Sequence, residues 1–367
     1  MTSQLFTPVT FGGLTLENRI VIAPMCQYSA DEGSATDWHM IHLGHLALSG
    51  AGMMILEATA VSPGGRISPD DLGLYSDANE AALSRVLTSL RRHSGIKIGI
   101  QLCHAGRKAS VKSPWEGGAQ IAPDAPRGWR AVGPSAIPMR PGEVPPTALD
   151  QTGIDKVLAD FAAAAERAGR LGFDAIEIHG AHGYLTHSFL SPISNRREDA
   201  YGGSLENRMR FALQVFETVR RAFPAERPVG MRISASDWLV GGWSIEDSVA
   251  LAAELKRRGI AYIHASSGGI SPDAKIPSEA GYQVPFAERI KRETGVTTIA
   301  VGLITEPEHA EAIIGRGQAD MVAMARAMLY DPRWPWHAAA RLGARVKAPS
   351  QYLRCQPREF KNLFSDS

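Results

Sequence analysis

Short apolar runs recur along the whole chain, and each is followed by a longer stretch with helical periodicity. We predict strands at eight of these runs: 20–24, 53–58, 97–102, 174–179, 228–233, 260–265, 297–301 and 320–324. Amphipathic stripes predict helices at 157–171, 207–223, 244–258 and 306–315, and the third opens with a Ser244-x-x-Asp247 capping pattern. Eight strand–helix repeats predict an α/β fold, a single parallel (β/α)8 TIM barrel.

The same alternation is compatible with an open, doubly wound sheet, whose first turn normally carries a glycine-rich dinucleotide fingerprint. No G-x-G-x-x-G follows the first predicted strand, which favours the barrel. The longest connection, 103–150, contains a run dense in proline and glycine at 123–146 and is too long for a bare barrel loop. We therefore expect an excursion after strand 3, a lid or hairpin over the active face.

Composition is that of an ordinary globular protein, with 44% hydrophobic and 21% charged residues among 367. Since α/β barrels extend well past 250 residues as one core, we expect residues 1–367 to form a single domain. The 39 basic and 38 acidic side chains leave a formal charge of +1, so neither nucleic acid nor an anionic membrane is an expected partner. No stretch approaches the ~18 apolar residues of a membrane span, and no targeting signal is evident.

The chain contains three cysteines, Cys26, Cys103 and Cys355. They are odd in number and widely spaced, which argues against a disulfide framework and against a closely spaced metal or iron–sulfur site. We therefore expect a cytoplasmic protein.

Reactive residues of a (β/α)8 barrel gather at the carboxyl ends of its strands, because the βα loops build the site there. Six of the eight predicted ends carry something polar or reactive, which favours an enzyme over a binding module. The eight ends are 24–26, 58–60, Gln101, His179 with His182 and Tyr184, Arg232, 266–268, Gly302 and Arg326.

The last two ends indicate a phosphate site. Loops after strands 7 and 8 of such barrels often bind phosphate through backbone N–H groups. Gly302 allows close backbone approach, and the guanidinium of Arg326 can hold a phosphate with two hydrogen bonds. Taken singly, Gly302 could merely turn the chain and Arg326 could pair with a helix carboxylate. Their occurrence at neighbouring ends favours a phosphorylated ligand or cofactor.

Several segments in barrel order resemble one family. They are NRIVIAPMCQY at 18–28, EATAV at 57–61, GIQL at 99–102, HAGRK at 104–108, EIHGAHGYL at 177–185, the runs 189–197 and 201–208, and RIS at 232–234. Together they resemble the Old Yellow Enzyme family of flavin-dependent ene-reductases, in particular its bacterial thermophilic-like and xenobiotic-reductase subclass. The similarity extends over almost the whole chain.

The resemblance implies FMN bound across the barrel mouth, reduced by NADPH and reoxidised by small activated alkenes such as α,β-unsaturated carbonyl or nitro compounds. In such a site Arg232 stabilises negative charge at N1 and the C2 carbonyl of the reduced flavin, and Gln101 binds the pyrimidine edge. The remaining residues implied to bind the cofactor are Pro24, Met25, Cys26 and Ala60 on the N5 side, and Gly302, Ala325 and Arg326 at the phosphate. Ala325 stands where relatives often carry glycine.

The same resemblance implies catalytic residues at His179, His182, Tyr184 and Cys26. His179 and His182 would bind the substrate's carbonyl or nitro oxygen, and Tyr184 would donate a proton to the α-carbon. Cys26 would lie near flavin N5, and Tyr28 would be a substrate-side residue of the same loop.

One alternative to the ene-reductase is a metal-dependent TIM-barrel hydrolase. It would use His179 and His182 as metal ligands, with Glu177 on the same strand face as His179. A metal site would leave Arg232 and the phosphate-type strand ends unexplained, so the flavin site is favoured.

Lys108 and the C-terminal segment leave further alternatives. Lys108 matches the last residue of the family's HAGRK turn, but it could as easily form a salt bridge under the long loop, so its role is left unassigned. The segment 345–367 carries Tyr352 and Arg354, which resemble residues that reach a partner subunit's site. A homodimer or a dimer of dimers is therefore expected, with Arg354 binding substrate in the neighbouring site; the competing interpretation is a frayed tail.

Overall fold

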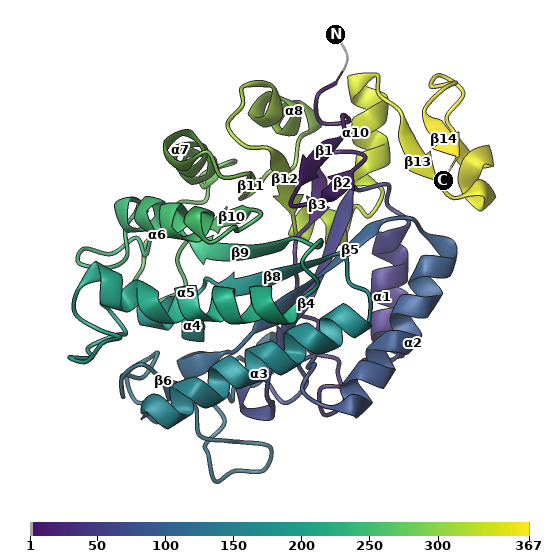
Figure 1. The fold of residues 1–367 in the computed structure, drawn as a ribbon. Helices are drawn as coiled ribbons and strands as arrows, with labels where there is room; N and C mark the ends of the chain where they lie inside the picture. The colour runs from purple at the N-terminus through teal and green to yellow at the C-terminus, as the bar shows by residue number, and fades with distance from the viewer. Residues whose placement is uncertain (1–2, 367) are drawn as a thin grey trace.

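The computed structural model describes residues 3–366. Eight parallel strands close into a barrel in the order β10-β11-β12-β3-β4-β5-β8-β9, so the predicted fold class is confirmed (Figure 1). Each predicted strand is present. The barrel strands are β3 (Ile20–Ile22), β4 (Met53–Ala60), β5 (Lys97–Cys103), β8 (Ala175–Gly180), β9 (Val229–Ser234), β10 (Ile263–Ser266), β11 (Thr298–Val301) and β12 (Met321–Met324).

Helices surround the barrel, as Figure 1 shows for α1, α2, α3 and α6. Four of them begin at a side-chain cap: Ser76, Asp150, Ser204 and Ser244 each accept a hydrogen bond from the N–H three residues later. The helices are α1 (Asp37–Ala47), α2 (Asp77–His93), α3 (Gln151–Arg170), α4 (Leu185–Leu190), α5 (Leu205–Ala222), α6 (Ile245–Arg257), α7 (Val284–Thr294), α8 (Pro307–Gly315), α9 (Arg326–Tyr330) and α10 (Trp334–Leu342). Among residues 3–366, no helix is long and apolar enough to span a membrane.

The half of the barrel interior at the amino-terminal ends of the strands is apolar. The hairpin of β1 (Val9–Phe11) and β2 (Leu14–Leu16) closes the barrel at this end. Phe11 meets the buried ring of Tyr262 edge to face, with ring centroids 5.5 Å apart. Gly230 on β9 leaves the room for that ring, because a Cβ there would lie 2.3 Å from it. Polar side chains occupy the other half, at the carboxyl ends of the strands.

The excursion after β5 is present, but it is not a hairpin. It contains the short 3-10 helices η2 (Gly106–Lys108) and η3 (Pro114–Glu116), and the two-residue strands β6 (Val132–Gly133) and β7 (Thr147–Ala148). β6 and β7 pair in parallel, so the chain between them loops back before it rejoins. Nη1 of Arg107 in η2 donates to the carbonyl oxygens of Ile137 (3.4 Å) and Pro138 (3.1 Å), and its Nη2 donates to that of Ile270, after β10. Arg107 thus ties this loop to the barrel.

The C-terminal segment is folded, not frayed. β13 (Val346–Ala348) pairs in parallel with β14 (Phe364–Asp366), and the 3-10 helix η4 (Ser350–Cys355) lies between them. Leu363 and Phe364 pack against Trp336 of α10. In Figure 1 this yellow segment lies on the opposite side of the molecule from β6.

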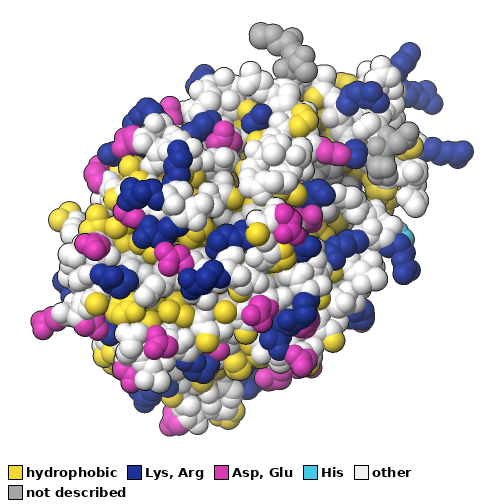
Figure 2. Space-filling view, in the orientation of Figure 1, with side chains coloured by type: hydrophobic (Ala, Val, Ile, Leu, Met, Phe, Trp, Pro, Cys, Tyr) yellow, Lys and Arg dark blue, Asp and Glu magenta, His cyan; other side chains and the backbone are white. Residues whose placement is uncertain are grey.

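Charged side chains of both signs are interspersed on the face shown in Figure 2. The view shows no extended surface of one sign, in keeping with the formal charge of +1.

We predict that Gly230→Ala destabilises the fold by about 1–3 kcal/mol, because the new methyl group must displace the buried Tyr262 ring. Thermal denaturation measures the loss. Gly95→Ala is the matched control, since a Cβ at Gly95 meets no atom within 4 Å. The explanation is wrong if both variants melt alike, or if adding Tyr262→Leu to Gly230→Ala restores none of the loss.

Candidate active site

The carboxyl end of β8 and the loop after it bring three predicted residues together. The ring centroids of His179 and His182 lie 5.2 Å apart, and those of His179 and Tyr184 lie 4.7 Å apart, both edge to face. His179 ends the barrel strand, while Tyr184 is the N-cap residue of α4. Two imidazoles and one phenol therefore converge at the mouth of the barrel.

Both imidazoles are neutral at pH 7. Burial, and then the positive charge of Arg232, lower the pKa values of His179 and His182 well below the ordinary value. Nδ1 of His179 accepts the backbone N–H of Ala181 at 3.3 Å, which places the ring hydrogen on Nε2. Nε2 of His182 pairs with Oγ of Ser266 at 2.8 Å, so its Nδ1 is the atom left for a ligand.

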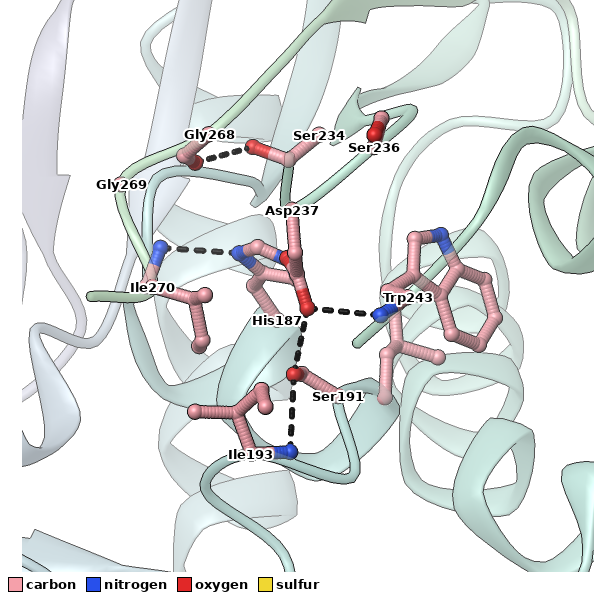
Figure 3. A network of polar contacts seen from close by, with 12 residues as sticks. His187, Ser191, Ile193, Ser234, Ser236, Asp237, Trp243, Gly268, Gly269 and Ile270 are labelled. Carbon is pink, nitrogen blue, oxygen red and sulfur yellow. Dashed lines mark hydrogen bonds and ion pairs between the residues drawn. The ribbon is translucent and has the colours of Figure 1, made fainter. Parts of the chain in front are cut away.

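A buried network fixes the backbone of this loop (Figure 3). His182 and Gly183 both have left-handed conformations, with φ of 58° and 78°. The N–H of Gly183 donates to Nδ1 of His187 (2.9 Å), whose Nε2 lies 3.0 Å from Oδ1 of Asp237. The hydroxyl of Ser191 donates to Oδ2 of Asp237 at 2.6 Å. This network holds an unusual turn in one conformation.

Asp237 is the charged centre of that network. Besides the Ser191 hydroxyl, its Oδ2 accepts the backbone N–H of Trp243 at 2.7 Å. Burial alone would raise the pKa of Asp237, but His187 and these hydrogen bonds hold it below the ordinary value. Sequence analysis did not identify Asp237, because an aspartate after a strand carries no signal until His187 lies beside it.

The loops after β8 and β10 interlock next to this turn. A Cβ on Gly183 would lie 2.2 Å from the carbonyl oxygen of Gly269, so only glycine fits there. Nζ of Lys108 donates to the carbonyl oxygens of His182 (2.8 Å) and Gly269 (3.3 Å) and joins the two loops. The alternative of a salt bridge for Lys108 is therefore wrong: among residues 3–366, no carboxylate forms an ion pair with it.

Arg232 has the most unusual electrostatic position in the site. It lies at the end of β9, is 8% exposed, and its guanidinium makes no hydrogen bond or ion pair with any residue the structure describes. Burial lowers its pKa and the negative charge of Glu177 opposes that shift, so the side chain stays cationic. A buried, unpaired cation lowers the stability of the fold unless a ligand forms hydrogen bonds with it.

Glu177 supplies the negative charge beneath Arg232. Its carboxylate accepts from Nε2 of Gln101 at 2.7 Å and pairs with Nδ1 of His264 at 2.9 Å. All of these side chains are buried in the barrel interior. Sequence analysis did not identify His264, whose place in this network is visible only once the strands are adjacent.

The loop after β3 carries Pro24, Met25, Cys26 and Tyr28 to the same mouth, all partly exposed. Oε2 of the buried Glu57 accepts the N–H of Gln27 at 2.9 Å and fixes the loop. Burial, and then Asp71 and Glu57, raise the pKa of the Cys26 thiol well above the ordinary value. Cys26 is thus a neutral thiol, in one cluster with Tyr28 and Tyr184.

Ala60 lies at the end of β4, but its main chain is already engaged. Its N–H donates to the carbonyl oxygen of Leu72 (2.8 Å), and its own oxygen accepts the N–H of Leu74 (2.9 Å). The second lone pair of its carbonyl oxygen and its methyl group are what remain for a ligand.

The predicted phosphate end lies after β11 and β12. Gly302 has φ of 129°, and Ala325 precedes the first turn of α9. The exposed Arg326 forms no ion pair within the described range 3–366, so the interpretation that it pairs with a helix carboxylate is not supported. Gln283, which sequence analysis missed, approaches here: its Oε1 accepts from Oγ of Ser267 at 2.6 Å, and its Nε2 donates to the carbonyl oxygen of Val301 at 3.0 Å.

A cavity of about 380 Å³ lies between the excursion and the two site tyrosines. Its lining includes Tyr28, Tyr184, Lys108, Arg140 and Glu143. A small molecule in this cavity would contact Tyr28 and Tyr184.

The metal alternative finds no support in the geometry. Within residues 3–366, no group of three or more His, Cys, Asp or Glu side chains could hold a metal ion. Glu177 does lie in the barrel interior with His179, but its carboxylate is engaged by Gln101 and His264.

Arg354 lies outside this site. It is exposed on η4, and no hydrogen bond or ion pair of its side chain is formed within the described part of the chain. Its neighbour Tyr352 packs near Trp336, with Arg333 5.6 Å from the Tyr352 ring centroid. Within one copy of the chain, Arg354 therefore takes no part in the cluster around His179.

Comparisons with known proteins agree with this geometry. Residues 4–344 match the model of the NADH:flavin oxidoreductase / NADH oxidase family. The chain is 45% identical over 356 residues to an NADPH dehydrogenase of Geobacillus sp. (strain WCH70), covering 96% of this chain and 99% of the relative. It is 44% identical to the NADPH dehydrogenase of Geobacillus thermodenitrificans (strain NG80-2) over the same shares.

Among solved structures, morphinone reductase superposes with a TM-score of 0.77 at 30% identity, covering 100% of this chain and 94% of the other. The family model spans more than nine-tenths of the sequence, and both relatives are covered nearly end to end. The chain therefore belongs to the NADH:flavin oxidoreductase / NADH oxidase family, the Old Yellow Enzyme family, and is a flavin-dependent oxidoreductase.

Proposed function

We propose that this protein is an NADPH-dependent FMN ene-reductase that reduces the C=C bond of α,β-unsaturated carbonyl or nitro compounds. The observation that carries the proposal is the cluster of two neutral imidazoles and one phenol, His179, His182 and Tyr184, at the same barrel mouth as the unpaired Arg232. Such a cluster can bind an oxygen and deliver a proton. NADPH is the reductant that the names of the curated relatives indicate.

The residues present fit FMN. Nε of Arg232 is buried without a partner in the described chain. A planar group with negative charge at its edge can accept hydrogen bonds from this guanidinium. Gln101 of β5 is held by Glu177 of β8, the strand between β5 and the strand of Arg232. Ala60 ends β4 beside it, and the Pro24–Cys26 loop follows β3, the next strand around the barrel. Gly302, Ala325 and Arg326 would hold the phosphate. When bound, FMN accepts two electrons from NADPH and supplies hydride to the alkene.

His179 and His182 would bind the carbonyl or nitro oxygen of the substrate. Nε2–H of His179 is a donor held in place by the Ala181 contact, and Nδ1 of His182 is left for the substrate because Ser266 occupies Nε2. Because neither ring is charged, a donor is available without an imidazolium having to form in a buried site. The pair stabilises the negative charge that develops on oxygen as the β-carbon accepts hydride.

Tyr184 would donate the proton to the α-carbon. Burial raises the pKa of its phenol well above the ordinary value, so the hydroxyl keeps its proton until a strong base such as an enolate forms. Cys26, as a neutral thiol, would adjust the electronics near N5, and Tyr28 would contact the substrate.

The exposed position of Arg354 supports a role in a partner's site. It lies on a folded segment with no contact to its own cluster, and a two-fold dimer would present one such arginine to each mouth. We therefore propose a homodimer, or a dimer of dimers, in which Arg354 binds substrate in the neighbouring subunit.

We predict that the purified protein is yellow and releases FMN, not FAD, on denaturation. Arg232→Met should weaken FMN binding about tenfold or more, since the cation that completes the flavin edge is lost. It should also stabilise the FMN-free protein by about 1–4 kcal/mol, because a buried unpaired charge is replaced by an apolar side chain. Fluorescence titration and thermal melts measure the two effects. Arg85→Met, at an exposed ion pair, is the control; an FMN-free protein that melts lower in Arg232→Met would contradict the assignment.

We predict that His179→Ala or His182→Ala lowers the rate of ene-reduction about 10²- to 10³-fold, the usual effect of losing one oxyanion donor. NADPH oxidation by O2 needs no hydrogen bonds to a carbonyl or nitro oxygen, so its rate should fall much less. Steady-state assays of both reactions test this, with the exposed His45→Ala on α1 as control. Equal losses in the two reactions would show that the pair supports the flavin or the fold.

We predict that Arg354→Ala raises KM for the alkene while FMN stays bound. Mixing Arg354→Ala with His179→Ala subunits should then restore activity, because a hybrid dimer contains one site with both residues intact. Arg345→Ala, an exposed arginine just before β13, is the control. A monomer by light scattering, or no recovery despite demonstrated subunit exchange, would refute the role in trans.

A further inference from the structure

Lys108 places an ammonium group against the ring of Tyr184. Its Nζ lies 5.1 Å from the Tyr184 ring centroid and donates to the carbonyl oxygens of His182 (2.8 Å) and Gly269 (3.3 Å). An ammonium group has three N–H donors, and two are engaged by these carbonyls. The carbonyls thus hold the charge beside the aromatic ring.

Backbone contacts of the excursion hold Lys108 in position. Gly106 begins η2 with φ of 61°, and a Cβ there would lie 2.8 Å from Cα of Leu185, the residue after Tyr184. The N–H of Leu185 donates to the carbonyl oxygen of His104 at 2.9 Å. η2 and the start of α4 are therefore in direct backbone contact, which sets the position of Lys108 relative to Tyr184.

We propose that Lys108 is a positioning residue for proton transfer, whose ammonium stabilises the phenolate that Tyr184 becomes when it donates its proton. The proposal rests on the proposed function. In that step the O–H bond of Tyr184 breaks and its electron pair stays on the phenolate oxygen. A C–H bond forms at the α-carbon from the electron pair of the enolate, and water from the cavity later returns a proton to the phenolate.

The physical reason is the change of charge on the ring. A cation over a neutral phenol ring is attracted to it, and the attraction increases when the ring becomes anionic. Lys108 therefore interacts more strongly with the state after proton transfer than with the state before it. Only such a differential interaction accelerates the step.

The charge of Lys108 is poised to change near neutral pH. Burial, and then the neighbouring Arg107 and Arg140, lower its pKa to about 8. The other charged or titratable groups facing it are Cys103 and Glu143 on the excursion side, and His179, His182 and Tyr184 on the β8 side.

Five of these seven neighbours keep one charge state between pH 7 and 9. The imidazoles of His179 and His182 have pKa values well below 6.5, and Cys103 and Tyr184 have pKa values well above their ordinary ones. Arg107, at about 10, stays charged until higher pH. The ammonium of Lys108 is present below pH 8 and lost above it, so its contribution to proton transfer falls as the pH rises through 8.

The test is a stopped-flow measurement of flavin reoxidation by 2-cyclohexenone in the holoenzyme. Lys108→Met should slow this half-reaction about 10- to 30-fold and increase its solvent isotope effect, with reduction by NADPH nearly unchanged. Lys108→Arg should retain most of the rate and remove the decline near pH 8. Lys156→Met, at an exposed pair with Asp160 on α3, is the control.

A double-mutant cycle separates this role from a structural one. If Lys108 acts through the Tyr184 proton, Lys108→Met should have little further effect in a Tyr184→Phe background. An equal loss in both backgrounds, or an equal loss in the reductive half-reaction, would overturn the proposal. A holoenzyme that reacts with NADPH but reduces no activated alkene would instead refute the proposed function.

A readout independent of turnover uses a fluorinated tyrosine at position 184, which is more acidic than tyrosine. Its pKa is followed by ¹⁹F NMR in the FMN-free protein. Lys108→Met should raise that pKa and Lys108→Arg should not. An unchanged pKa in Lys108→Met would overturn the coupling even if the alkene assay failed.

Discussion

The buried guanidinium of Arg232 is the constraint on which the site depends. It lies near the carboxyl end of β9, and no group that the structure describes hydrogen-bonds it. Glu177 stabilises the charge from below, but its oxygens are held by Gln101 and His264. The barrel therefore presents a fixed cation and leaves its donors for a ligand, at a cost in stability of the unliganded protein. FMN, the cofactor of the family, is a ligand of the required shape and charge.

The loop after β8 depends on a second feature, the interlock of two irregular loops. His182 and Gly183 adopt left-handed conformations that no helix or strand would impose. The His187–Asp237 pair holds the turn from within the barrel wall, and Lys108 holds it from the excursion. Because these contacts come from α4, the loop after β9 and η2, the positions of the two histidines depend on three separate parts of the chain.

Sequence analysis could predict the barrel because its signal is local and repeated. Each strand is an apolar run bounded by turn residues, and the strand ends then form a single list of site candidates. The pairing of β6 with β7 and the docking of Leu363 and Phe364 on Trp336 could not be predicted in this way, since each joins segments that no periodic pattern connects. For the same reason His264 and Asp237 were missed: their partners Glu177 and His187 lie 87 and 50 residues away in the chain.

Burial gives the site neutral proton carriers, one permanent cation and one titratable cation. The same desolvation that keeps His179 and His182 uncharged keeps Tyr184 and Cys26 protonated. Arg232 stays charged because a guanidinium loses its proton only at very high pH, whereas burial lowers the pKa of Lys108 to about 8. In the proposed reaction, hydride and proton reach different carbons of one double bond. A site with an unchanging cation at the flavin edge and a titratable cation at the proton donor can therefore stabilise the two transfers separately, and only the second should depend on pH in the neutral range.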